Sequence, residues 1–76
     1  MRHMQPRLIV TFETTAMALK MEKVCRAAGA AGRLIPVPRE ITAGCGLAWM
    51  APPEEQAQLQ TVMQQGGVQP QAIQVL

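Results

Sequence analysis

The feature of this chain that most constrains its fold is an alternation of short apolar runs with amphipathic segments of helical spacing. Residues 8–12 form a compact, β-branched apolar run that is typical of a buried strand. Further strands are expected at residues 33–37, 47–50 and 72–76. Helical spacing predicts one helix over residues 16–28 and a second that begins near Pro52. The predicted order is strand, helix, strand, strand, helix, strand.

Each predicted helix carries its own start and stop signals. Thr14 or Thr15 can cap the first helix by accepting a backbone N–H, and Gly29 supplies the left-handed residue that ends it. Prolines and carboxylates at residues 52–55 favour the start of the second helix, and glycines at 66–67 end it. The apolar side chains expected to face the core are Met17, Ala18, Met21, Val24, Cys25 and Ala28, then Leu59, Val62 and Met63.

This order of elements predicts an α+β fold, a two-layer sandwich of the ferredoxin-like kind. Four strands would form a mainly antiparallel sheet with both helices on one face. Pro36 and Pro38 favour an edge position for the second strand, because proline cannot donate to a ladder. The chain of 76 residues, 49% hydrophobic and 16% charged, has room for one packed domain over residues 1–76. Residues 1–6 are expected to be flexible. Residues 38–46 are expected to form a loop, and the sequence does not decide whether this loop contains a helical turn.

Composition excludes several classes of function. The chain has no Asp, Asn, Ser or Tyr, so Ser–His–Asp hydrolysis, Asp-based phosphoryl transfer and Asp-rich calcium loops lack their parts. A dispersed net charge of +2, with one Trp and one Phe, argues against a nucleic-acid partner. We expect no membrane span and no signal peptide, and the expected location is the reducing cytoplasm.

No metal or cofactor site is expected. Tetrahedral zinc takes Cys or His ligands in close pairs, and Cys25, Cys45 and His3 are far apart in the sequence. The turn after the first strand holds no cysteine, which excludes a CxxC copper site. Glu54 and Glu55 are adjacent at a helix start, where they complement the helix dipole and point in different directions. They therefore do not predict paired-carboxylate catalysis.

Cys45 is the residue most suggestive of chemistry. It stands between Gly44 and Gly46, which leave the backbone open and let another molecule approach the sulfur. Arg39 or, as the second candidate, Arg33 would favour the thiolate form if it lies nearby. The alternative is that Cys45 is a small buried side chain at the start of a strand. Cys25 lies on the apolar stripe of the first helix and is expected to pack in the core. The sequence does not decide whether Cys25 and Cys45 form a disulfide.

The loop that leads to Cys45 is similar to that of a known family. Residues 36–41 (PVPREI), followed by residues 45–48 (CGLA), resemble short proteins described as putative selenium/sulfur carrier protein-like. The resemblance extends to residues 18–20, 22–23, 29, 33–36 and 52–54, and covers about residues 8–76. Serines are expected just before the cysteine in such proteins. Here Thr42, Ala43 and Gly44 stand instead, which leaves fewer hydroxyl donors near the thiol.

The resemblance implies a carrier that holds sulfur or selenium on Cys45 as a persulfide or selenopersulfide and passes it between larger enzymes. Arg39 would stabilise the thiolate, the two glycines would give access to the sulfur, and the prolines would stiffen the loop that presents it. The residues expected to form the binding surface are Pro36, Pro38, Glu40, Gly44 and Gly46. The expected partners are transient, namely a cysteine desulfurase or another sulfur or selenium carrier.

The sequence also allows other functions. The chain could be a non-catalytic interaction or regulatory module, and a buried Cys45 beside an exposed apolar patch around Trp49 would favour that interpretation. A redox sensor that uses Cys45 alone would need a partner thiol. The strand-rich edges would also allow a homodimer. An ordinary metabolic enzyme is the least supported class, because no acid–base set can be assembled from these residues.

Overall fold

The computed structural model describes residues 5–41 and 44–76. The strands are β1 (Leu8–Thr11), β2 (Arg33–Pro36), β3 (Leu47–Ala51) and β4 (Ala72–Val75). The helices are α1 (Thr15–Ala28), a short 3-10 turn at Pro53–Glu55, and α2 (Gln56–Gly66). The predicted order of elements is confirmed. The expected flexibility of residues 1–6 falls mainly on residues outside those described.

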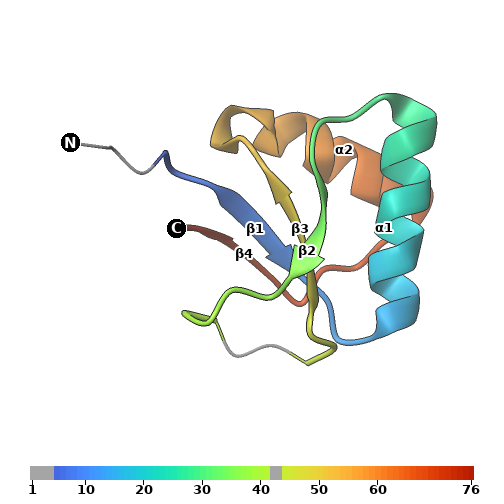
Figure 1. The fold of residues 1–76 in the computed structure, drawn as a ribbon. Coiled ribbons are helices and arrows are strands. Elements are labelled where there is room, and N and C mark those ends of the chain that lie inside the picture. Colours follow the sequence, from blue (N-terminus) through green and yellow to red (C-terminus); the bar gives the residue numbers. More distant parts are fainter. Residues whose placement is uncertain (1–4, 42–43) are drawn as a thin grey trace.

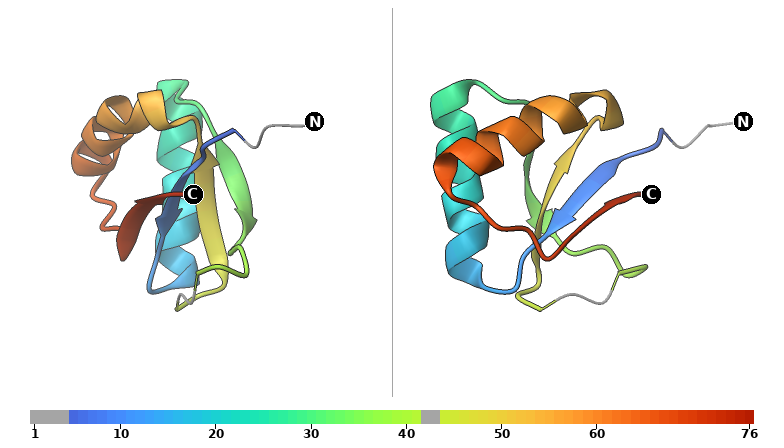
Figure 2. Two further views of the ribbon diagram at one scale, coloured as in Figure 1. Left: turned by 90° about the vertical axis from the view of Figure 1, so that its left-hand side faces the viewer. Right: turned by 180° about the vertical axis from the view of Figure 1, so that it is seen from behind.

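The four strands form one antiparallel sheet in the order β2-β3-β1-β4 (Figure 1). Strands β1 and β3 are central, and β2 and β4 are the edges. The edge position predicted for β2 from its prolines is therefore confirmed. Both helices pack on one face of this sheet (Figure 2), as the predicted ferredoxin-like α+β sandwich requires. Neither helix of the described residues has the length and apolar character needed to cross a membrane.

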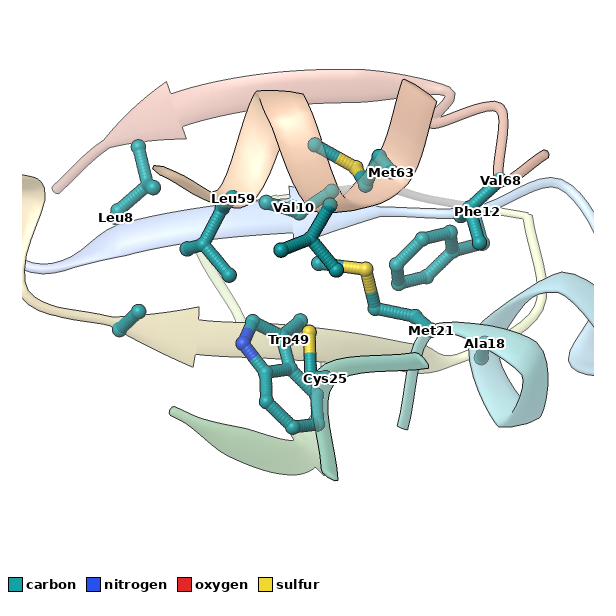
Figure 3. Close-up of a cluster of buried hydrophobic side chains, with 12 residues drawn as sticks. Leu8, Val10, Phe12, Ala18, Met21, Cys25, Trp49, Leu59, Met63 and Val68 are labelled. Carbon is teal, nitrogen blue, oxygen red and sulfur yellow. The ribbon is translucent and has the colours of Figure 1, made fainter. Parts of the chain in front are cut away.

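The main core lies between the sheet and the helices (Figure 3). It is filled by side chains from β1, β3 and both helices, together with Phe12 after β1 and Val68 after α2. Trp49 of β3 is 3% exposed and packs in this core. Its indole Nε1–H donates to the Ala31 carbonyl at 3.1 Å. Gly32 has a φ of 118°, and a Cβ there would collide with this indole nitrogen, so the turn into β2 requires glycine.

The helix ends follow the sequence signals closely. The Thr14 hydroxyl accepts the Met17 N–H at 3.2 Å, and Gly29 ends α1 in the left-handed region with a φ of 67°. Of the predicted core stripe on α1, Ala18, Met21 and Cys25 are buried, whereas Ala28 is exposed. The prediction for Ala28 is wrong because it is the last residue of α1, so no following helical turn covers it. The predicted stripe of α2, Leu59, Val62 and Met63, is buried.

A second, smaller cluster lies on the opposite face of the sheet. It consists of Ile9, Ala48 and Ile41, which are buried, with Ile35, Val37, Met50 and Leu76 packed around them. No residue of either helix takes part. Ile41 comes from the loop between β2 and β3, so this loop folds back over the helix-free face. In the described part of this loop the Ile41 N–H donates to the Pro38 carbonyl at 3.0 Å and closes a single turn, while residues 42–43 lie outside the described residues.

Candidate functional site

Cys45 lies at the end of the β2–β3 loop, two residues before β3 begins. Its side chain is half-buried and packs against the edge of the main core, on the same side of the sheet as the helices. The thiol donates to the Leu47 carbonyl at 3.5 Å. Cys45 is therefore neither a core residue nor a fully exposed one, and it lies at the rim of the core.

The structure favours glycine on either side of Cys45 for two different reasons. Gly46 has a φ of 80°, which favours glycine, and a Cβ placed there would meet nothing within 4 Å. The space beside this peptide is open. Gly44 instead packs closely, since a Cβ there would lie 3.2 Å from the Glu13 carbonyl oxygen. Its N–H donates to Gln71 Oε1 at 3.3 Å. These contacts hold the loop against the turn before α1 and the approach to β4.

The rest of the loop is anchored at both ends. The Val37 N–H donates to the Gly46 carbonyl at 3.0 Å, which extends the β2–β3 ladder by one step. Arg39 and Glu40 are exposed in the turn closed by Ile41. Within residues 5–41 and 44–76, no hydrogen bond or ion pair joins the Arg39 guanidinium to Cys45. The predicted pairing of Arg39 with the thiolate is thus not made in this conformation.

The remaining predicted binding residues frame this loop. Pro36 is the exposed last residue of β2, and Pro38 is half-buried with its carbonyl in the turn. Thr42 and Ala43, which stand where serines were expected, lie outside the described residues.

Cys25 is buried at 0% exposure on the inner side of α1, as its place on the apolar stripe predicts. Burial raises the pKa of this thiol, because the charged thiolate would lose its hydration. Both cysteines are free, so the Cys25–Cys45 disulfide left open by the sequence is not formed.

Sequence reasoning missed three residues that shape the site. Ile41 ties the loop to the helix-free face of the sheet, Gln71 holds the Gly44 N–H, and the Glu13 backbone packs against Gly44. The only signal for Ile41 is an apolar side chain inside a loop. Nothing in the sequence links Gln71 to Gly44, because they lie 27 positions apart and meet only through the order of the strands.

Of two hollows on the described surface, one adjoins the site and the other does not. One of about 370 Å³ includes Glu13 and Gln71 in its lining and so adjoins the Cys45 loop. A larger one of about 640 Å³ lies at the opposite end of the sheet, around Arg7, Arg33 and Met50. The larger hollow is thus remote from the thiol. Among the described residues there is also no group of three or more His, Cys, Asp or Glu that could hold a metal ion.

Comparison with protein families matches most of this chain to a known group. The family described as putative Se/S carrier protein-like matches residues 7–74. The chain belongs to this family. No curated protein and no solved structure is detectably similar to it. The match confirms the resemblance drawn from the sequence, and covers nearly the same residues.

The alternative of an interaction module would be favoured by a buried Cys45 beside an exposed apolar patch around Trp49. In this family member Trp49 is buried at 3% exposure, and Cys45 is only half-buried.

Proposed function

We propose that this protein is a carrier of sulfur or selenium, with the cargo held on Cys45 as a persulfide or selenopersulfide. The observation that supports this most is the half-buried Cys45 thiol at the rim of a small fold, beside the open space at Gly46, in a chain of the Se/S carrier protein-like family. Such a protein is a carrier and not a catalyst. A reducing cytoplasm would keep its thiol free between transfers.

The transfer step is a thiol–disulfide type of exchange. The Cys45 thiolate attacks the terminal sulfur of a persulfide on the donor protein. A new S–S bond forms to Cys45, the donor's S–S bond breaks, and the electron pair leaves on the donor thiolate. Sulfur has moved with no net oxidation, so no external oxidant or reductant is needed. Delivery is the same exchange with an acceptor thiolate, and a terminal selenium atom follows the same course.

The loop residues have distinct roles in this proposal. Arg39 is exposed in the turn and is not paired with Cys45 in the free chain. Its guanidinium would approach the persulfide anion only when a partner docks. Pro36 and Pro38 restrict the loop and reduce the entropy lost on docking. Glu40 and the glycines complete the surface offered to a cysteine desulfurase or a second carrier.

The position of Cys25 supports a carrier over a redox couple. A second accessible thiol would attack the Cys45 sulfur of the persulfide. A disulfide between the two cysteines would form, and the outer sulfur or selenium atom would be lost. Cys25 is 0% exposed in the core, so it can reach that persulfide only if the core opens.

The test is to load the protein with a cysteine desulfurase and free cysteine and to measure the mass of the intact chain. We expect wild type and the control Cys25→Ala to gain the mass of one sulfur atom, which a reducing agent removes. Cys45→Ala should gain none. Arg39→Gln should load more slowly without losing its fold. A wild-type chain that stays unmodified while the desulfurase persulfide is present would overturn the proposal.

A further inference from the structure

The two edges of the sheet differ in how they are protected against other strands. At the β2 edge, Pro36 lacks an N–H and Arg33 adds a charge, which are common guards against strand addition. At the β4 edge, residues 72–75 contain neither proline nor a charged side chain. Val75 of β4 is 54% exposed and is one of the two large apolar side chains most open to solvent in the described residues.

The hydrogen bonds of β4 show which of its backbone groups point outward. Arg7 and Leu76 exchange both of their N–H···O bonds, at 2.9 and 2.8 Å. Along an antiparallel strand such inward pairs alternate with residues whose N–H and C=O point the other way. Ile73 and Val75 therefore direct their N–H and C=O groups away from β1, where no described residue pairs with them.

A groove runs beside this edge on the helix-covered side of the sheet. It has a volume of about 400 Å³ and is lined by Met63, Val68, Pro70 and Ile73, with Gln60 and Gln64 of α2 at its border. Val75 lies on the same side of the sheet, because it pairs with the core residue Leu8. An added strand would thus gain ladder bonds from β4 and apolar contacts in the groove.

Neither β4 nor the lining of this groove contains a charged side chain. Residues 56–76, which contain α2 and β4, include no Asp, Glu, Lys, Arg or His, although the chain has a net charge of +2. A second copy can therefore approach this surface without like-charge repulsion. Glutamine amides both donate and accept, so the Gln60, Gln64 and Gln74 side chains are self-complementary across a twofold axis.

We propose that the protein forms a twofold-symmetric dimer in which β4 pairs antiparallel with β4 of a second copy. Ile73 of one copy lies opposite Val75 of the other, each pair exchanges both N–H···O bonds, and Gln74 sits at the axis. Two short strands alone bury less than the roughly 1,000 Å² of a stable interface, so the border of α2 supplies the remaining contact. Gln71, which holds the Gly44 N–H, precedes β4 and takes no part in the new pairs at residues 73 and 75, so the Cys45 loop keeps this contact in the dimer.

Sedimentation equilibrium of the full chain over a concentration series tests this dimer. We expect wild type to dimerise, and Val75→Lys to raise the dissociation constant at least about tenfold, equivalent to roughly 1.4 kcal/mol. Leu19→Lys is the matched control, because Leu19 is similarly exposed at 51% but lies on α1. It adds the same charge and should leave the dissociation constant unchanged.

Amide hydrogen exchange then locates the contact. The Val75 amide should become protected as concentration rises, whereas the inward-facing Gln74 amide should be protected throughout. A monomer at every concentration, a dimer unaffected by Val75→Lys, or a Val75 amide that becomes protected only with a different protein would each overturn the proposal. Sulfur loading of Cys45 is measured separately and does not depend on this outcome, since Val75→Lys should load as wild type does.

Discussion

At the scale of single residues, the two cysteines show how surroundings decide what one side-chain type can do. Cys25 is enclosed by the core, and its burial raises the pKa of its thiol. Cys45 lies at the rim, with its only protein hydrogen bond among the described residues to the Leu47 carbonyl. The sequence predicted this division from helical spacing for Cys25 and from flanking glycines for Cys45. It did not predict that Arg39 would stand apart from the thiol.

The raised pKa of Cys25 makes stability depend on pH in a defined direction. An unfolded cysteine has a pKa of about 8.5. As the pH rises past this value, the unfolded chain loses this proton before the folded chain does, so folding becomes less favourable. We expect the free energy of unfolding to lose up to about 1.4 kcal/mol per pH unit from this residue. Urea titrations of wild type and Cys25→Ala at several pH values isolate the effect, and a pH-independent difference between them would contradict it.

At the scale of elements, the contact between the helices depends on Gly66. A Cβ at this position would lie 2.6 Å from Cγ1 of Val24, so α2 approaches α1 through the missing side chain. In an isolated helix, alanine would be about 1 kcal/mol more favourable than glycine. Here the overlap with Val24 should cost about 1–3 kcal/mol and outweigh that gain.

The pair can be tested by a double-mutant cycle. We expect Gly66→Ala to destabilise wild type but to stabilise Val24→Ala, in which the obstructing methyl groups are absent. Denaturant unfolding of the four proteins measures both signs. If Gly66→Ala has the same effect in both backgrounds, the helices do not meet at this point as described.

At the scale of the whole molecule, the sheet separates two hydrophobic clusters that stabilise different parts of the fold. The larger one, which includes Leu59, joins the helices to the sheet, and the smaller one holds the β2–β3 loop through Ile41. Loosening the smaller cluster should therefore release the Cys45 loop without opening the core around Cys25.

Alkylation of the two thiols under native conditions distinguishes the two clusters. We expect Ile41→Ala to cost about 2 kcal/mol, the low end of the range for isoleucine, because Ile41 is 9% exposed in the smaller cluster. It should raise the alkylation rate of Cys45 several-fold while Cys25 stays protected. Leu59→Ala should cost about 2–5 kcal/mol and expose Cys25 through global unfolding. Mass spectrometry of the labelled peptides gives the ratio of the two rates. An unchanged ratio in Ile41→Ala would show that the loop does not depend on its anchor.

The sequence by itself determined the order of the elements, the helix ends at Thr14 and Gly29, the edge position of β2 and the burial of Cys25. These features depend on periodicity and on residues that are neighbours along the chain. Only the tertiary structure decided that Gln71 holds Gly44, that Ile41 covers the helix-free face, and that the uncharged residues 56–76 surround an unguarded edge. Such contacts join segments far apart in the sequence, and they exist only once the strands have paired in one order and the helices have chosen one face of the sheet.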